Sequence, residues 1–249
     1  MRPDVYFCYA TGALWVVALT LYGVRIAARG AFHSERVSKI GGTALVGRGV
    51  MDMTYWAIEP VVRGLAAIGV TPNGLTFGAL VLGVGAGVAL ALGWFGLATL
   101  LATMSTIGDI LDGQVARLTN TGSDRGELLD AAVDRYTEFA FLAGLVIYLR
   151  ASWWQMALAL GATLASFMVS YATAKAEALK VTPPRGLMRR HERSIYLIGG
   201  IGFTPLVGPV LAAHGWLYIT PCLVALGIVA VIGNLAAVIR LVRIGRALR

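Results

Sequence analysis

The chain has 249 residues, of which 57% are hydrophobic and only 14% are charged. This composition excludes an ordinary soluble domain and is typical of a protein that crosses the membrane several times. The formal net charge is +8. Most of the cations fall on one side of the topology described below, so the charge indicates contact with anionic lipid and argues against nucleic acid as a partner.

Seven stretches are apolar enough and long enough to cross a bilayer, for which about 20 residues are needed. They are residues 4–28, 72–94, 97–118, 127–149, 153–178, 194–213 and 216–239. Because most connections between them are short, we expect a single all-α integral membrane bundle. The chain then divides into an N-terminal transmembrane anchor (1–30), a connection at the inner membrane face (31–70) and a six-span domain (71–249).

The basic residues predict the orientation of these spans. If the amino terminus lies outside and the spans alternate, most lysines and arginines fall on the inner side, and Arg2 and Arg150 remain outside. This distribution follows the positive-inside rule. We therefore predict a multi-pass protein of the cytoplasmic membrane.

The connection before the second span contains a polar stripe. The stripe consists of Arg48, Asp52, Tyr55, Glu59 and Arg63. Because these residues recur every three or four positions, they share one face of a helix, and we expect an amphipathic helix on the inner membrane surface. Pro60 counts against one unbroken helix, so a partly ordered polar loop is the alternative.

Four aspartates stand in or beside predicted spans. Asp109 and Asp112 are three residues apart, so their side chains leave the same face of one helix. Asp130 and Asp134 are four apart on the next helix and share a face in the same way. The connection at residues 119–126 is short, which makes the two helices antiparallel neighbours. We expect the four carboxylates to converge between them.

Ionised side chains at membrane depth are costly and persist mostly for function. Four carboxylates together repel one another, and Arg117 offsets only one charge. Divalent cations such as Mg²⁺ prefer oxygen ligands and are often held together with substrate phosphates, and two ions about 4 Å apart recur in phosphoryl transfer. An ion path through a transporter and a structural salt-bridge network are the alternatives. The sequence has no Cys or His cluster that would indicate zinc.

The spacing of these acids resembles the signature of the CDP-alcohol phosphotransferase family, D-x2-D-G-x2-A-R-x8-G-x3-D-x3-D. The matching residues are Asp109, Asp112, Gly113, Ala116, Arg117, Gly126, Asp130 and Asp134. The resemblance extends over about residues 70 to 240 in the arrangement of spans. It implies a bundle of six core helices, a homodimer and a site open to the cytosol. It also implies transfer of a substituted phosphate from a CDP-linked lipid to an alcohol, with release of CMP.

The resemblance also implies a role for each signature residue. Asp109, Asp112 and Asp130 would ligate metal, and Asp134 would complete a second metal site and act as the general base. The cofactor would be two Mg²⁺ or Mn²⁺ ions. The residues expected to bind the CDP group are Gly113, Ala116, Arg117 and Gly126. The span at 4–28 is additional to the six-helix core of the family, and the sequence does not assign it a role.

A second stretch bears on the acceptor alcohol. It resembles the region of prokaryotic phosphatidylinositol-phosphate synthases in which Y-x2-A-[RK]-A-E precedes R-x2-R. The matching residues are Tyr171, Ala174, Lys175, Ala176 and Glu177, followed by Arg190 and Arg193. The resemblance implies that Lys175, Arg190 and Arg193 hold the phosphate of inositol phosphate. Glycerol phosphate or another polar alcohol is the alternative acceptor, and membrane anchoring is the alternative explanation for the three cations.

Overall fold

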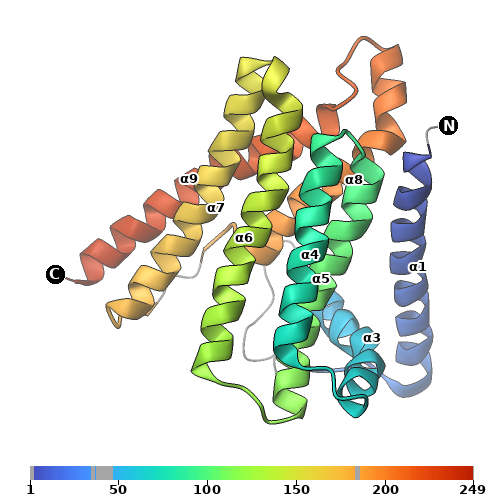
Figure 1. Cartoon of the computed structure of the whole chain (residues 1–249), viewed down its shortest axis with the longest axis vertical. Coiled ribbons are helices and arrows are strands. Elements are labelled where there is room, and N and C mark those ends of the chain that lie inside the picture. Colours follow the sequence, from blue (N-terminus) through green and yellow to red (C-terminus); the bar gives the residue numbers. More distant parts are fainter. Residues whose placement is uncertain (1–2, 35–36, 38–46, 183–185, 249) are drawn as a thin grey trace.

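The structure, a computed structural model, describes residues 3–34, 37, 47–182 and 186–248, and all regular elements in this part of the chain are helical. The long helices are α1 (Asp4–Arg29), α3 (Arg48–Ala67), α4 (Pro72–Ala91), α5 (Phe95–Leu118), α6 (Asp124–Tyr148), α7 (Trp153–Ala178), α8 (Arg190–Ala213) and α9 (Thr220–Ala247). A short 3-10 turn, Leu149–Ala151, joins α6 to α7. From α4 onward, successive helices alternate in direction along one bundle (Figure 1).

Six of the seven predicted spans form helices whose length and hydropathy suit a membrane crossing, namely α1, α4, α5, α7, α8 and α9. The seventh, predicted at 127–149, lies in α6. This helix has 25 residues, but its first fifteen include seven charged side chains, so it does not meet the same criterion. α6 nevertheless packs along α4 within the bundle (Figure 1). The charges that lower its hydropathy belong to the site described below.

Small residues allow α4 to pack against both α5 and α6. A Cβ atom added at Gly87 would lie 2.2 Å from the carbonyl oxygen of Ala140 on α6, and one at Gly144 would lie 2.0 Å from the carbonyl oxygen of Gly87. The Ser105 hydroxyl on α5 donates to the Ala79 carbonyl on α4 at 2.7 Å. Close backbone approach through small residues is typical of packing between membrane helices, and here it fixes α4 as the common partner of the two acidic helices.

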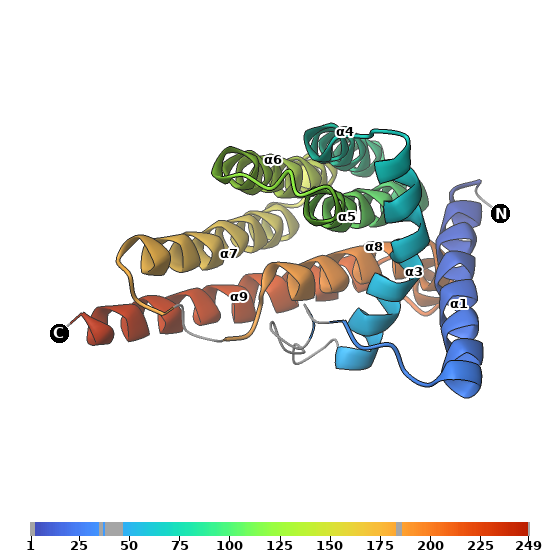
Figure 2. The same cartoon turned by 90° about the horizontal axis from the view of Figure 1, so that it is seen from below.

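The amphipathic helix predicted in the first connection is α3, and it continues through Pro60 without a break. It crosses one end of the bundle when the molecule is seen from below (Figure 2). Ile58 and Val62 pack against the α5 residues Leu111 and Val115. Asp52 does not remain on an exposed polar stripe: it is buried and accepts a hydrogen bond from the Ser34 backbone N–H at 2.9 Å.

The additional helix α1 packs on α5 and α8. The Asp4 carboxylate accepts a hydrogen bond at 3.0 Å from the backbone N–H of Leu97. Leu97 lies in the first turn of α5, where N–H groups have no partner within their own helix. A Cβ at Gly96 would lie 1.9 Å from the Asp4 carbonyl oxygen, so glycine at this position permits the contact. α1 is therefore held against the bundle at its amino-terminal end.

Candidate active site

The four aspartates lie toward one end of the bundle, in the second half of α5 and the first half of α6 (Figure 1). The two helices run antiparallel, as the short connection predicts. They make little direct backbone contact, however, because α4 packs along both of them. Figure 2 shows the three helices arranged as a triangle. The carboxylates thus extend toward one another from two helices that a third helix holds in place.

Three of the four carboxylates form a compact group. Asp109, Asp112 and Asp130 each offer an oxygen, and these oxygens lie within 4.8 Å of one another. Asp112 is buried, and its Oδ2 accepts a hydrogen bond from the Thr76 hydroxyl at 2.6 Å. Converging carboxylate oxygens suit hard divalent cations such as Mg²⁺ and Mn²⁺. A second residue that orients a ligand is a common feature of metal sites, so the donor set fits the cation that the sequence predicts.

Asp134 is buried beside this group and contacts Arg190 at the start of α8. Nη1 of Arg190 donates to both carboxylate oxygens of Asp109, at 3.1 and 3.0 Å, and Nη2 contacts Asp134 Oδ1. One guanidinium therefore bridges carboxylates of α5 and α6. Because it supplies one positive charge against four aspartates, the site retains an excess of negative charge that a divalent cation would neutralise.

Arg193, the other arginine predicted to bind the acceptor phosphate, is buried and paired with a carboxylate. Its side chain is only 1% exposed, and its Nε and Nη2 donate to the Glu138 carboxylate at 2.8 to 3.1 Å. Its Nη1 donates to the Met188 carbonyl at 2.9 Å. Arg135 also contacts Glu138, at 3.3 Å. The network joins α6 to α8 and fixes the segment that leads into Arg190.

Two further cations lie on α7 and α9. Lys175, the third predicted acceptor ligand, is exposed near the end of α7. Arg240 on α9 is buried and donates to Thr173 Oγ1 at 3.1 Å and to the carbonyl oxygens of Gly186 and Leu187 at 3.4 and 2.8 Å. Among the described residues, no carboxylate accepts a hydrogen bond from Arg240, and its buried Nε has no acceptor.

The residues predicted to bind CDP lie beside the carboxylates on the same two helices. Gly113 and Ala116 are half-buried on α5, and a Cβ at Gly113 would lie 3.3 Å from the Arg117 guanidinium. Arg117 itself is exposed. Gly126 lies in the first turn of α6, where its backbone N–H donates to the hydroxyl of Ser123, the N-cap residue, at 3.1 Å. A Cβ at Gly126 would likewise lie 3.3 Å from the Ser123 hydroxyl, so both glycines allow a neighbouring polar side chain to lie close to the backbone.

Sequence reasoning missed three residues that the fold brings to the site or its supports. Glu138 continues the four-residue repeat of Asp130 and Asp134 along α6, so the repeat contained a signal for it. Thr76 and Arg240 come from helices distant in sequence, and no local spacing linked them to the acidic cluster. Their roles depend on the packing of α4 against α5 and of α9 against α7.

These features define a polytopic helical membrane protein with a carboxylate site suited to a divalent cation and phosphate. The family model for CDP-alcohol phosphatidyltransferase matches residues 69–220, more than half of the chain and the whole acidic cluster. The chain belongs to the CDP-alcohol phosphatidyltransferase family and is an enzyme of that class. Because this match includes the carboxylates themselves, it replaces the transporter and salt-bridge interpretations.

Relatives within the family are also similar over most of their length. The phosphatidylinositol phosphate synthase of Corynebacterium glutamicum is 33% identical over 165 residues, which cover 61% of this chain and 72% of that protein. The phosphatidylinositol phosphate synthase of Mycobacterium marinum is 32% identical over 187 residues, covering 68% and 76%.

Solved structures of one such synthase share the fold. The crystal structure of Mycobacterium tuberculosis phosphatidylinositol phosphate synthase with CDP-DAG bound has a TM-score of 0.63 and 26% identity, covering 74% of this chain and 92% of that one. The complex of the same synthase with manganese and citrate has a TM-score of 0.65 and 25% identity, covering 74% and 87%. Both matches exclude part of this chain, and the family model begins only at residue 69, after α1 and α3.

Proposed function

We propose that this protein transfers the phosphatidyl group of CDP-diacylglycerol to inositol phosphate and releases CMP. The observation that carries the proposal is the group formed by Asp109, Asp112 and Asp130 within the family-matched segment. The choice of donor and acceptor is supported by the relatives named phosphatidylinositol phosphate synthase and by the solved relative that contains CDP-DAG. Glycerol phosphate is the second candidate acceptor, because it too would require cations that capture a phosphate.

The proposed cofactor is a pair of Mg²⁺ or Mn²⁺ ions held by Asp109, Asp112, Asp130 and Asp134. When bound, such ions polarise phosphoryl oxygens and stabilise the attacking and leaving oxygens of the displacement. The manganese complex of the solved relative supports this choice. The remaining chemistry falls to side chains that orient the substrates and accept a proton, the main contributions of a protein to phosphoryl transfer.

In the proposed reaction, a hydroxyl oxygen of the acceptor forms a bond to the phosphorus that carries the diacylglycerol. The bond from that phosphorus to the bridging oxygen breaks, and its electron pair leaves with CMP. Asp134 takes the hydroxyl proton as general base, with Arg190 holding its carboxylate in place. Gly113, Ala116, Arg117 and Gly126 form the proposed CDP pocket; the two glycines and the small Ala116 side chain leave room for the nucleotide.

For the acceptor phosphate we propose Arg190 and Lys175 as ligands, with Arg193 as the residue that positions Arg190. Arg193 has all three guanidinium nitrogens engaged by Glu138, Ser170 or Met188, whereas Lys175 is exposed. Arg240 is added to this set because a buried cation with no carboxylate among its described acceptors favours an anion nearby. Arginine suits a phosphate because of its forked donors.

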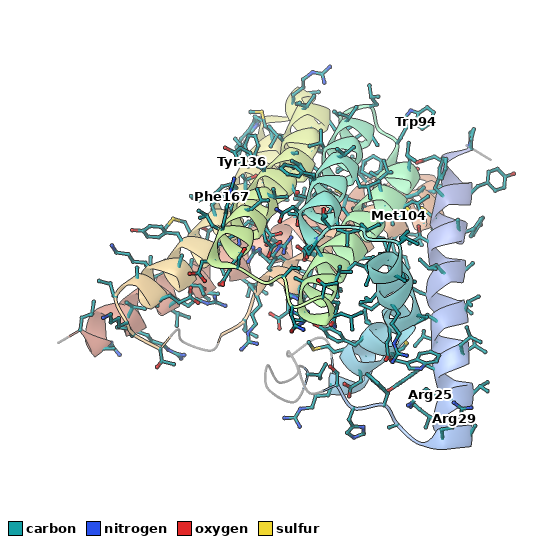
Figure 3. All side chains as sticks on the ribbon, turned by 60° about the horizontal axis from the view of Figure 1, so that its bottom comes forward. Arg25, Arg29, Trp94, Met104, Tyr136 and Phe167 are labelled. Carbon is teal, nitrogen blue, oxygen red and sulfur yellow. The ribbon has the colours of Figure 1, made fainter. Side chains whose placement is uncertain are left out.

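We also propose that the site faces the cytosol and that the protein is a homodimer. Arg25 and Arg29 lie at the end of the molecule opposite Trp94 (Figure 3), and the acidic site belongs to the same end as these arginines (Figure 1). The positive-inside rule places that end in the cytosol. Tyr136 and Phe167 lie on the outer faces of α6 and α7 (Figure 3), which offers an aromatic surface for a second copy.

The function is tested with purified protein in detergent, CDP-diacylglycerol, Mg²⁺ or Mn²⁺, and a set of acceptors. We expect CMP release that depends on both the metal and inositol phosphate. Glycerol phosphate, free inositol and serine are the matched alternatives. Faster release with glycerol phosphate would replace the proposed acceptor, and the absence of CMP release with every acceptor would refute the proposed donor reaction.

A further inference from the structure

A long apolar cavity lies between α1, α3, α5 and α8, outside the carboxylate group. Its volume is about 400 Å³, within the range of about 300–1,000 Å³ that is usual for small-molecule sites. α1 contributes Cys8, Gly12 and Trp15 to the wall, and α8 contributes Ile198 and Phe203. One side of the cavity is therefore formed by a helix that precedes the family-matched residues.

The wall is apolar even though it contains five threonines. Their hydroxyls donate to backbone carbonyls four residues earlier on their own helices, at 2.8 to 2.9 Å: Thr11 to Phe7, Thr54 to Val50, Thr99 to Phe95, Thr103 to Thr99 and Thr106 to Ala102. Because these donors are already used within the helices, a polar ligand would lose its hydration without gaining comparable partners. The cavity favours a hydrocarbon.

The cavity reaches helix positions next to residues of the carboxylate site. Ile110, which lines it, follows Asp109 in sequence, and His191, which also lines it, follows Arg190. From there the cavity extends along α5 to Thr99, a span of eleven residues or about 16 Å at the helical rise of about 1.5 Å per residue. This length matches one leaflet, since the hydrocarbon core of a bilayer is about 30 Å thick.

We propose that this cavity receives one hydrocarbon chain of the lipid donor, and that α1 forms its outer wall and limits the size of the chain that fits. The inference rests on the proposed function for the identity of the donor. The headgroup would lie at the carboxylates, and the chain would leave it along α5 past Ile110. The contact between Asp4 and Leu97 holds the wall against α5 at its amino-terminal end. α1 is then a specificity-determining element and not only an anchor.

Gly12 offers a direct test, because a Cβ added there would meet no atom within 4 Å. Gly12→Leu adds a side chain that begins in this open space and extends into the cavity, and leucine also favours the helix more than glycine. Gly23→Leu is the matched control: it lies on the same helix, its Cβ would also meet nothing within 4 Å, and it does not line this cavity.

Both variants are assayed with CDP-dioctanoylglycerol and CDP-dioleoylglycerol. In Gly12→Leu we expect the KM for the dioleoyl donor to rise about tenfold, the scale on which an apolar pocket discriminates. The KM values for the dioctanoyl donor and for inositol phosphate should change little, and Gly23→Leu should behave as the unmodified protein. An unchanged ratio of the two donor KM values in Gly12→Leu contradicts the assignment of α1.

A second measurement does not depend on turnover. The unmodified protein is irradiated with CDP-diacylglycerol that carries a diazirine in one acyl chain, and the crosslinked peptides are identified by mass spectrometry. Crosslinks within residues 8–15 of α1 support the proposal; crosslinks confined to helices other than α1 overturn it, as does the absence of any crosslink. If the protein releases no CMP but still crosslinks through α1, the proposed reaction fails while the chain cavity stands.

Discussion

Arg190 on α8 donates from one guanidinium nitrogen to both carboxylate oxygens of Asp109 on α5, 81 residues earlier in the chain, at 3.1 and 3.0 Å. Its second terminal nitrogen contacts Asp134 on α6. Arg190 therefore links α8 to the aspartates of both α5 and α6. These two helices carry the two halves of the signature.

Arg190→Gln should lower kcat by roughly 100-fold, because it releases the carboxylate of the proposed base, Asp134, and general-base catalysis typically contributes about 10²–10⁴-fold. The KM for inositol phosphate should also rise, since the same side chain is a proposed ligand of the acceptor phosphate. CMP release under saturating donor measures both effects. The exposed Arg243 lies on α9, and Arg243→Gln serves as the control for loss of one inner-face charge. An unchanged kcat in Arg190→Gln would exclude a role for this arginine in the proposed reaction.

Asp134→Asn should nearly abolish turnover while CDP-diacylglycerol still binds. The amide has the shape of the carboxylate but cannot accept the hydroxyl proton, and general-base catalysis typically contributes about 10²–10⁴-fold. Binding of radiolabelled donor and CMP release are measured on the same preparation. Asp124→Asn, in the exposed first turn of α6, is the control. Residual turnover close to that of the control would assign the proton to another group.

Thr76→Val should weaken activation by the metal. The substitution preserves the shape of the side chain and removes the hydrogen bond of 2.6 Å to Asp112 Oδ2. Residues that orient a metal ligand typically contribute about 10–100-fold to metal affinity or activity. The concentration of Mn²⁺ that gives half-maximal CMP release should therefore rise about tenfold or more.

The control for this effect is Thr163→Val on α7, where the hydroxyl donates only to the Ala159 carbonyl of its own helix. Its metal dependence should match that of the unmodified protein. Equal metal dependence in Thr76→Val and Thr163→Val would mean that Thr76 does not orient a metal ligand.

Glu138→Ala should destabilise the fold. It would leave Arg193 buried without its carboxylate partner, and breaking a buried ion pair from one side costs about 3–5 kcal/mol. Thermal unfolding in detergent, followed by circular dichroism, measures the change. Glu59→Ala removes the partner of Arg63 in an exposed pair and should cost at most about 1 kcal/mol. A double variant, Glu138→Leu with Arg193→Met, removes both charges and should recover much of the lost stability. If the stability is not recovered, the pair contributes more than the neutralisation of one buried charge by the other.

Gly87→Ala should force α4 and α6 apart, because the new Cβ would lie 2.2 Å from the Ala140 carbonyl oxygen. Overpacking of this kind typically costs about 1–3 kcal/mol. Gly78→Ala on the same helix is the matched control, since its Cβ meets nothing within 4 Å, and it should stabilise the helix by up to about 1 kcal/mol. The melting temperatures of the two variants should move in opposite directions. A melting temperature of Gly87→Ala equal to or above that of the unmodified protein would show that the approach of α4 to α6 tolerates a methyl group.

The sequence by itself determined the helical class, the boundaries of most spans and the faces on which the aspartates lie. These follow from local physics: a bilayer requires a long apolar helix, and residues three or four apart share a helix face. The same reasoning overestimated the apolar character of α6, whose charged residues belong to the site. It also underestimated the continuity of α3, because the helix continues through Pro60 without a break.

Only the tertiary structure decided which groups meet across helices. It brought Thr76 to Asp112, paired Arg190 with Asp109 and Asp134, and buried Arg193 against Glu138. It also placed α1 along α5 and α8 as the wall of a cavity. Helical periodicity fixes the direction of a side chain within its own helix, but its partners depend on how closely and at which point distant helices pack. Here that packing depends on glycines and buried charges of α4, α6 and α8, whose effect appears only when the helices are assembled.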